Sequence, residues 1–400
     1  MKILIISNTF PYPQTKGGTH CRNFNLIDYL RKHHQVTLIT QQTPDVKPEE
    51  VNELKEIVQE LVIFPSKPPS KTSIFNKIKR FTDFIIQGKP PSVMANYLPE
   101  IQQWIDDAVS KNKFDLIAGE HTVNEIYIRP EWKNKISTLI DIHSSVYRTC
   151  QDQLATKTSE NPWRDRLNKP LLYRYEKNYC QKFSKIIVTT KEDKATINQL
   201  SHRKDIEIIP NGVNLDMFPC RENTITEHTL MIAGGMDYIV NADGACFFGL
   251  EVFPLIQEKY PRAKLLIVGS KPTQAVQSLS KNNSIIVTGR VPSMVDYLHQ
   301  TTISVVPLRS GFGMKIKTLE AMAAGIPVVA SDRGLEGLTV DNPLCALRAN
   351  TIDEYVKQIS KLFDNSDLRQ EIAYNARKMI ENHYTWEKAA MGYEKIITGE

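Results

Sequence analysis

The residues best suited to chemistry lie late in the chain, where two lysines and a glutamate follow a glycine-rich turn. The turn reads SGFG (310–313), and Lys315, Lys317 and Glu320 come shortly after it. Lysine ammonium groups and free backbone N–H groups attract phosphate oxygens. A carboxylate can accept hydrogen bonds from both hydroxyls of a vicinal diol. A diphosphate attached to a ribose presents both features, so the segment predicts a nucleoside-diphosphate site.

The elements around this segment place it at the edge of a parallel sheet. The apolar run ISVVPL (303–308) predicts a buried strand, and 317–324 predicts a helix that ends at Gly325. Pro327 then opens a further apolar run, PVVAS. A loop between a strand and the next helix lies at the carboxyl edge of such a sheet, where ligands bind. We therefore expect the chemistry at this edge.

The rest of the chain repeats the strand–helix alternation in two series. Because βαβ units imply parallel sheets, we predict an α/β protein with two Rossmann-like domains. Their join lies near 208–228, where Asn-Gly and proline interrupt the periodicity. The stretch from about 380 to the end predicts a helix that follows no strand of its own. The predicted strands are 2–7, 35–40, 61–64, 115–119, 137–143 and 185–190, then 229–235, 263–270, 284–290, 303–308 and 327–331.

Composition restricts the class of protein. The 400 residues suit two domains, 41% are hydrophobic and 24% charged, as in soluble globular proteins. No apolar run approaches the roughly 18 to 20 residues that span a bilayer. The first apolar run ends in asparagine and prolines without a small-residue cleavage site, so we interpret it as a buried strand and not a signal peptide. The six cysteines stand singly, which favours a reducing cytoplasm over a disulfide or zinc framework.

The net charge of +5 is concentrated in one segment. Between Lys67 and Lys89 there are six positive residues and one negative, with Ile and Phe near helical spacing. Such a basic amphipathic helix could lie on an anionic membrane surface. The alternative is an ordinary helix that packs its apolar side inward and leaves its lysines in solvent.

Several blocks together resemble a known family. They are the Gly17–Gly18 loop, LYRYEKNYCQKFSKIIVTTKED, IIPNGVNLDMF at the domain join, GGMDYIVNADG, LLIVGS, VTGRV and PLRSGFGMKIKTLEAMAAGIPVVAS. With these blocks the chain resembles the retaining family 4 glycosyltransferases of the GT-B fold over nearly its whole length. The resemblance implies two Rossmann-like domains facing each other across a cleft. It implies an acceptor domain at 1–208, a donor domain at 209–380, and a terminal helix at 381–400 that packs back onto the first.

The implied reaction moves a sugar from a UDP-, GDP- or ADP-sugar to an acceptor hydroxyl, keeping the anomeric configuration. The acceptor stays open among a glycan, a lipid-linked molecule and a small molecule. No cofactor and no metal are expected, since no Asp-x-Asp motif stands in a suitable loop. No nucleic-acid partner is expected. The implied location is the cytoplasm, with peripheral contact at the inner face of the membrane as an additional expectation.

In the resemblance, Glu320 is the second of the family's two glutamates and holds the donor ribose. Phe312 stands at the position of the first, which touches the transferred sugar, so this chain departs from the family there. The sugar hydroxyls would then be held largely by backbone amides of the glycine-rich turn. The residues assigned to this part of the substrate site are Gly311, Phe312, Gly313 and Met314.

A second departure concerns charge. Family members often place an arginine and a lysine after the first strand of the donor domain, yet GGMDYIVNADG contains neither. Lys315 and Lys317 are the candidates to replace them at the diphosphate. Because residues two apart on a helix face different directions, both reach it only if the loop persists through Lys315. Gly235 and Arg290 complete the donor-side candidates, through backbone approach and as a weaker cation.

On the acceptor side, the amides of Gly17 and Gly18 precede a helix and could approach the diphosphate or the sugar; a plain turn is the alternative. His143, after the strand STLIDI, matches a family histidine that faces the transferred sugar, and we take it as a catalytic candidate. His121 follows DLIAGE in a similar place. Either histidine could instead be structural.

Three rival functions remain. A nicotinamide-dependent dehydrogenase is disfavoured, because neither domain's first strand is promptly followed by G-x-G-x-x-G. A sugar-nucleotide epimerase of the same fold would consume donor without an acceptor. A non-catalytic partner subunit would bind nucleotide but never release a sugar, and Phe312 with the missing basic pair favours it over the epimerase.

Overall fold

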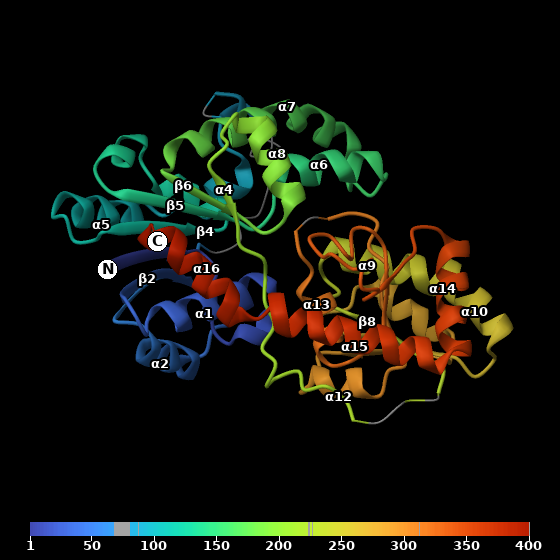
Figure 1. Ribbon diagram of the computed structural model, residues 1–400. Coiled ribbons are helices and arrows are strands. Elements are labelled where there is room, and N and C mark those ends of the chain that lie inside the picture. Colours follow the sequence, from blue (N-terminus) through green and yellow to red (C-terminus); the bar gives the residue numbers. More distant parts are fainter. Residues whose placement is uncertain (68–80, 87, 223–224, 226, 312, 400) are drawn as a thin grey trace. The chain divides into compact units, whose positions relative to one another are not determined.

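The structure is a computed structural model that describes residues 1–67, 81–86, 88–222, 225, 227–311 and 313–399. The chain forms two compact units (Figure 1). Unit 1 is Met1–Pro210 together with Ala389–Glu400, and unit 2 is Asn211–Lys388. The expected boundaries were 208/209 and 380/381. Most of the basic segment 67–89 falls outside the described residues.

Unit 1 is built on a seven-stranded sheet in the order β3-β2-β1-β4-β5-β6-β7, and every neighbouring pair is parallel. Its central strands are buried along almost their whole length, as expected where helices cover both faces. The strands are β1 (Lys2–Ser7), β2 (Gln35–Gln42), β3 (Glu60–Pro65), β4 (Leu116–Glu120), β5 (Ser137–Ile142), β6 (Lys185–Val188) and β7 (Ile206–Ile208).

The helices of unit 1 connect these strands and cover the sheet (Figure 1). They are α1 (Gly18–Leu30), α2 (Pro48–Ile57), α4 (Pro91–Ala95), α5 (Pro99–Ser110), α6 (Val146–Ala155), α7 (Pro162–Tyr179) and α8 (Lys191–Ser201). Shorter 3₁₀ turns lie between them at Gln14–Lys16, Thr122–Tyr127, Pro130–Asn134 and Cys180–Lys182.

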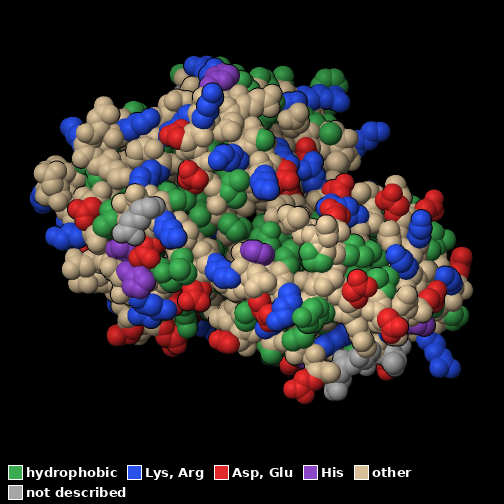
Figure 2. All heavy atoms as spheres, in the orientation of Figure 1, with side chains coloured by type: hydrophobic (Ala, Val, Ile, Leu, Met, Phe, Trp, Pro, Cys, Tyr) green, Lys and Arg blue, Asp and Glu red, His purple; other side chains and the backbone are tan. Residues whose placement is uncertain are grey.

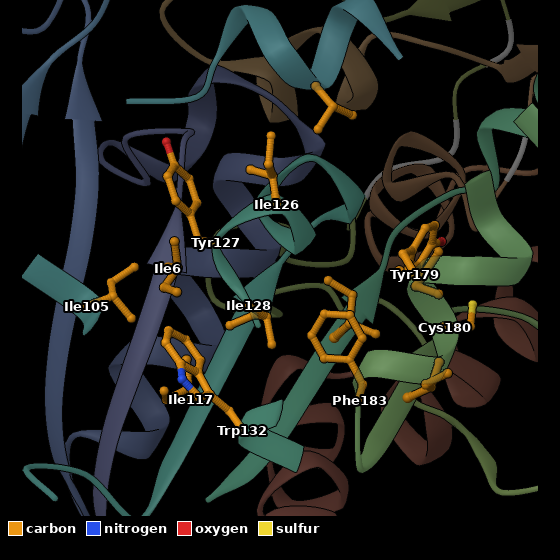
Figure 3. Packing of buried hydrophobic residues seen from close by; sticks show 14 of the residues in the cluster. Ile6, Ile105, Ile117, Ile126, Tyr127, Ile128, Trp132, Tyr179, Cys180 and Phe183 are labelled. Atoms are coloured by element: carbon orange, nitrogen blue, oxygen red, sulfur yellow. The ribbon is translucent and has the colours of Figure 1, made fainter. Parts of the chain in front are cut away.

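One continuous apolar core lies under the helices of unit 1. Isoleucines from β1, β4 and the segment after β4 meet aromatic side chains from loops and from α7 (Figure 3). Ile6, Ile117 and Tyr179 are each at most 1% exposed. This packing fixes the sheet, so the loops at its carboxyl edge start from a rigid base.

Unit 2 carries a six-stranded sheet in the order β10-β9-β8-β11-β12-β13, also parallel throughout. The strands are β8 (Thr229–Ala233), β9 (Lys264–Val268), β10 (Ile285–Gly289), β11 (Ile303–Val306), β12 (Val328–Ala330) and β13 (Leu347–Arg348). Its helices are α9 (Ile239–Phe247), α10 (Phe253–Lys259), α11 (Gln274–Gln277), α12 (Met294–His299), α13 (Ile316–Ala323), α14 (Ile352–Asp364) and α15 (Ser366–His383). The last helix, α16 (Trp386–Thr398), begins in unit 2 and lies mainly in unit 1. A further 3₁₀ turn lies at Ser278–Lys281.

A π-helical segment, Phe248–Val252, joins α9 to α10 in one long apolar helix. By length and composition alone, Ile239–Lys259 would be able to cross a membrane. However, half of its most apolar window is buried inside unit 2, where Phe248 and Phe253 are fully covered. We therefore interpret it as a core helix of unit 2.

The end of the chain differs from the single helix predicted from about 380. The helix α15 ends at His383, and α16 begins at Trp386. Between them, the backbone N–H of Val213 donates to the carbonyl of Tyr384 at 2.9 Å, and Val213 forms a parallel bridge with Thr385. The linker residue Val213 thus occupies the carbonyl of Tyr384, which in a continuous helix would accept a hydrogen bond from within the helix. This explains the break.

Residues 389–398 of α16 belong to unit 1 and lie against α1 (Figure 1). The carboxylate of Glu394 accepts a hydrogen bond from the hydroxyl of Tyr29 at 3.1 Å and contacts the rings of His33 and His34, both at 2.9 Å. Lys185 donates to the carbonyl of Ile396. The last helix is therefore an integral part of unit 1.

Prediction for the strand ends of unit 2. The ends of β8 and β9 approach so closely that a Cβ on Gly269 would stand 1.7 Å from the carbonyl oxygen of Gly234. We expect Gly269→Ala to lower the free energy of unfolding by about 3 kcal/mol or more, because the backbone must shift. Urea denaturation measures the change. The control is Gly289→Ala, at φ +71° with no atom within 4 Å of the added Cβ, which should cost about 1 kcal/mol. Equal losses in the two variants would contradict the close-approach argument.

Candidate functional site

The carboxyl edge of unit 2 has a topological switch point between β8 and β11. These strands are neighbours, while the chain leaves β8 toward β9 on one side and leaves β11 toward β12 on the other. Ligands of open α/β sheets bind at such a point. The Gly234–Gly235 turn follows β8, and the glycine-rich loop 307–315 follows β11. The predicted donor segment is thus placed at the position where a ligand is expected.

The glycine-rich loop is held in a conformation that needs its glycines. Gly311 has φ +93° and Gly313 has φ +72°, which side chains rarely adopt. A Cβ on Gly311 would also lie 3.0 Å from Cγ1 of Val240. The side-chain amide of Asn211 donates to the carbonyl of Met314 at 3.1 Å and ties down the end of the loop. Phe312, the position of the missing first glutamate, lies outside the described residues.

The loop persists through Lys315, which is the N-cap residue of α13 with extended backbone angles. This is the condition under which both lysines could face one ligand. The ammonium group of Lys315 nevertheless turns back to donate to the carbonyl of Gly313, at 2.7 Å. It stiffens the loop in this arrangement.

Lys317 reaches across to the turn after β8. Its ammonium group donates to Oδ1 of Asn241, on α9, at 2.6 Å. The amide of Asn241 is oriented in turn, since its Nδ2 donates to the carbonyl of Gly235 at 2.9 Å. A Cβ on Gly234 would lie only 2.7 Å from Nζ of Lys317. Gly234, at φ +144°, therefore makes room for the ammonium group.

Burial changes the ionisation of the two charged residues of α13. Desolvation lowers the pKa of Lys317 from its ordinary 10.5 to about 7, and the positive charge of Lys315 adds to this effect. Desolvation raises the pKa of Glu320 to about 7, opposed by the charge of Lys317. Asn241 supplies a neutral acceptor and no negative charge. The site therefore holds an ammonium group whose charge is only partly compensated, which favours an anionic ligand.

Asn241 and Gly234 are functional candidates that the sequence prediction missed. The prediction searched GGMDYIVNADG for the family's cations and found none, and it did not consider that an amide could orient a lysine from another helix. The signal was present as an asparagine at the start of a helix after a glycine pair.

The remaining donor-side candidates lie at the same edge of the sheet. Gly235 shares the turn after β8, where a Cβ would stand 3.2 Å from Oδ1 of Asp237. Arg290 follows β10, one of the two edge strands, and is exposed. Two strands separate it from β11, so the structure groups Gly235, and not Arg290, with the lysine site.

In unit 1 the two candidate histidines lie together at the carboxyl edge. His121 follows β4 and His143 follows β5, and their rings meet edge to face with centroids 5.1 Å apart. Desolvation lowers the pKa of His143 to about 4 and that of His121 to about 3. Both rings are therefore neutral near pH 7. The side chain of His143 is 10% exposed.

A buried charged cluster lies directly beneath His143. Arg22, from the first turns of α1, donates to both carboxylate oxygens of Asp141 at 2.7 and 3.1 Å. Oε2 of Glu120 lies 3.5 Å from Nε2 of His143, and Oε1 of Glu120 accepts from the hydroxyl of Tyr393 at 3.1 Å. Arg22, Asp141, Glu120 and Tyr393 are each at most 2% exposed. The sequence prediction missed these four residues, which act together only in the folded chain.

The cluster could be considered as a metal site, since ligand atoms of Glu120, Asp141 and His143 all lie within 4.8 Å of one another. The guanidinium of Arg22 already engages both oxygens of Asp141 and places positive charge beside them. Burial, with the nearby charge of Asp141, raises the pKa of Glu120 and favours its protonated form. These residues therefore fit an internal ion pair with a protonated neighbour better than a divalent cation.

A second buried acid supports the loop that carries His143. Glu176, on α7, accepts from the hydroxyl of Ser145 at 2.6 Å and from the backbone N–H of Val146 at 2.7 Å. It thus caps the start of α6, two residues beyond His143. Desolvation raises the pKa of Glu176 to about 7. The role of Glu176 was also missed, although it lies in a block that carried the family resemblance.

Gly17 and Gly18 form the N-cap and first residue of α1 and are both exposed. A Cβ on Gly17 would meet only Nδ1 of His20, at 3.4 Å. One turn later, Arg22 of the same helix pairs with Asp141 at the end of β5. The start of α1, with its free N–H groups, is thereby tied to the edge that carries His143.

Comparison with known proteins now identifies the family. Residues 16–217 match the family described as Glycosyltransferase Family 4, and residues 227–365 match Glycosyl transferases group 1. The first match alone covers half of the chain. The chain is a family 4, group 1 glycosyltransferase.

Relatives of this glycosyltransferase are distant. An uncharacterised 44.6 kDa protein of the cps region of Klebsiella pneumoniae is 23% identical over 97% of both chains. The capsular polysaccharide biosynthesis glycosyltransferase CapM of Staphylococcus aureus is 23% identical over 47% of this chain and 53% of its own.

Solved structures show the fold. Sucrose-phosphate synthase of Thermosynechococcus elongatus superposes with a TM-score of 0.72 at 18% identity, covering all of both chains. Anabaena HepE, solved with UDP-glucose, has a TM-score of 0.63 at 13% identity and the same full coverage. The two parallel-sheet units of this glycosyltransferase therefore have the GT-B fold, as the sequence resemblance predicted.

Prediction for the buried ion pair. Arg22→Met leaves the carboxylate of Asp141 buried without its guanidinium, so we expect the free energy of unfolding to fall by about 3–5 kcal/mol. Adding Asp141→Leu should recover much of this loss. Urea denaturation of the single and double variants measures the coupling.

The control for this cycle lies on the same helix. Arg31 pairs with Asp28 at 2.8 Å, but both side chains are about one-third exposed, so Arg31→Met should cost less than about 1 kcal/mol. If Arg22→Met costs no more than Arg31→Met, the buried pair does not hold α1 to β5 as described.

Proposed function

We propose that this glycosyltransferase transfers a sugar from a nucleoside-diphosphate sugar to an acceptor hydroxyl, with retention of configuration and without a metal ion. The observation that carries the proposal is the partly compensated ammonium group of Lys317 at the β8/β11 switch point. A half-buried cation beside a loop whose glycines have positive φ angles, with the backbone N–H groups of that loop, suits a diphosphate. Such a group stabilises negative charge more strongly than it would in water.

In this proposal the donor lies along unit 2. The diphosphate contacts Lys317 and the amides of the loop around Gly313. Glu320, three residues further along α13, accepts the ribose hydroxyls. Binding of the diphosphate would restore the ordinary protonated state of Lys317, since a nearby anion raises the pKa of a lysine. The leaving group would thus find a full positive charge in place before the bond breaks.

In the proposed reaction the leaving diphosphate accepts the proton of the acceptor hydroxyl. The bond between the anomeric carbon and the phosphate oxygen breaks, and a bond from the same face of the sugar to the acceptor oxygen forms. The acceptor proton passes to the departing phosphate oxygen. His143, neutral near pH 7, would contribute a hydrogen bond to the sugar, not a charge. This division of roles needs no protein nucleophile.

The comparisons support the substrate classes. HepE was solved with UDP-glucose, and the staphylococcal relative acts in capsular polysaccharide biosynthesis. We propose a UDP-sugar as donor before GDP- or ADP-sugars, and a glycan or lipid-linked glycan as acceptor.

Metal independence is supported by the engagement of Asp141 with Arg22 and by the lysine at the proposed diphosphate position. A cytoplasmic location at the inner face of the membrane agrees with a nucleotide-sugar donor.

The alternative is a non-catalytic subunit that binds nucleotide only. It is favoured by Phe312 in place of the sugar-touching glutamate. The two functions differ in one observable, release of sugar from the bound donor.

Prediction for donor and reaction. A thermal-shift panel of UDP-, GDP- and ADP-sugars should give stabilisation by one nucleotide class, unchanged by EDTA. The stabilising donor is then incubated with and without candidate acceptors, and NMR follows the anomeric configuration of the product. Stabilisation without any sugar release, even to water, would identify the non-catalytic subunit. Absence of stabilisation by every nucleotide would overturn the proposed function.

Prediction for the lysines. Lys317→Met should weaken binding of the stabilising donor at least about 100-fold, since a charge contact near 4 Å contributes on the order of 4 kcal/mol at an effective dielectric of 20. Lys315→Met should weaken it less, because its ammonium group is engaged with the loop carbonyl. Isothermal titration calorimetry measures both. Lys271→Met is the control: its side chain is 75% exposed in the loop after β9. Equal effects at 315 and 317 would refute the assignment to Lys317.

Prediction for the ribose contact. Glu320→Gln should weaken donor binding about tenfold or more, because charge-assisted hydrogen bonds contribute roughly 1.5 to 3 kcal/mol each. The same calorimetric titration, extended to the free nucleoside, separates ribose from phosphate contacts. Unchanged affinity for both ligands would remove Glu320 from the site.

A further inference from the structure

The outer face of α7 exposes large apolar side chains. Trp163 is 77% exposed and Leu167, one turn further on, is 60% exposed. Pro170 is exposed on the same line of the helix, since positions three and four apart share a face. The opposite face is firmly packed, because Tyr175 and Tyr179 are buried in the core of unit 1. The exposed row is thus a fixed surface feature of a well-anchored helix.

The charges of α7 are sorted between its two faces. In this helix, which is described throughout, both acidic residues point inward: Asp165 is 8% exposed and Glu176 is fully buried. Glu176 caps α6, and Asp165 accepts from the hydroxyl of Ser159 at 2.6 Å. Four of its five cations, in contrast, are exposed: Arg164, Arg166, Arg174 and Lys177. The outer face therefore combines apolar and positive side chains, without an exposed acid of its own.

The cations flank the apolar row closely. The guanidinium of Arg166 lies over the ring of Trp163, 5.6 Å from its centroid. Arg164 also pairs with Asp165 at 2.9 Å and remains 54% exposed. Figure 2 shows hydrophobic and Lys/Arg side chains together on the part of unit 1 where Figure 1 labels α7. An indole among cations is the combination that settles at the boundary between lipid headgroups and acyl chains.

We propose that the outer face of α7 binds an anionic membrane surface. Trp163 and Leu167 enter the headgroup region, and the flanking arginines and lysine attract acidic lipids. Charge complementarity selects this partner, because the exposed charged side chains of α7 are all cations, which an anionic lipid surface attracts. The inference is independent of the proposed donor and acceptor chemistry.

The proposal adds a second element to the expectation of membrane contact through 67–89, which stays a prediction because most of that segment lies outside the described residues. The described residues 81–86 also expose apolar side chains. Ile85 and Ile86 are 44% and 78% exposed, while Phe84 beside them is buried in the same core cluster as Tyr175.

The test is co-sedimentation of the whole protein with phosphatidylcholine vesicles, with and without phosphatidylglycerol. We expect binding only to the anionic vesicles, and its loss at about 1 M salt, where the screening length is about 3 Å. Trp163 also reports directly: its emission should shift to the blue on binding, and Trp163→Phe should abolish the shift while keeping most of the binding.

Two double variants divide the apolar and charge contributions. Trp163→Ala/Leu167→Ala should weaken vesicle binding about tenfold or more. Arg166→Gln/Arg174→Gln should weaken it to a similar extent and reduce its salt dependence. The matched controls lie in unit 2. Leu250→Ala removes a leucine that is 67% exposed, and Lys357→Gln/Lys361→Gln removes two exposed cations of α14. Circular dichroism confirms that each variant is folded.

Other outcomes would overturn the proposal. Equal losses in the control variants would show non-specific attraction by the whole positively charged protein. Binding to a soluble polyanion such as dextran sulfate, without binding to vesicles, would indicate a glycan-binding face. A concentration-dependent dimer that Trp163→Ala disrupts would assign the face to a second copy of the chain.

Discussion

The organisation of both units depends on how their buried ionisable groups are compensated. An ionised group removed from water must be compensated or it will shift its ionisation. In unit 1, Arg22 and Asp141 compensate each other through two hydrogen bonds. In unit 2, the hydrogen-bond partner described for Lys317 is the neutral oxygen of Asn241, and the carboxyl group of Glu320 opposes its charge only in part. The charges at the edge of unit 1 are thus compensated within the protein, whereas the charge of Lys317 is compensated less completely, as our proposal of an anionic donor requires.

The ion pair at the carboxyl edge of the sheet of unit 1 also connects the elements around His143. The ion pair joins α1 to β5, and the hydroxyl of Tyr393 joins α16 to the neighbouring Glu120. These contacts bring together residues more than 100 positions apart and fix the strand ends beside His143. They can therefore position a neutral histidine ring precisely.

The sequence predicted the long strands of both sheets and the family because buried apolar runs are visible locally. It missed β7 and β13, which have three and two residues and are too short to show a period. It also missed the break between α15 and α16, because Val213, which occupies the freed backbone carbonyl, lies far away in the chain. The sequence named candidate residues for the site, but it did not predict the hydrogen bonds between them. That Lys317 and not Lys315 reaches the turn after β8 follows from Asn241 and Gly234, which no local pattern links to α13.

The two faces of α7 have different contacts, and one helix therefore links them. Its inner face carries Glu176, whose carboxylate holds Ser145 and Val146 at the start of α6. Its outer face carries Trp163 and Leu167, four turns or less away along the same helix, with Pro170 between the two groups. One helix thus joins an exposed indole to the carboxylate that caps α6. A displacement of α7 as a whole would move the loop that follows His143 with it.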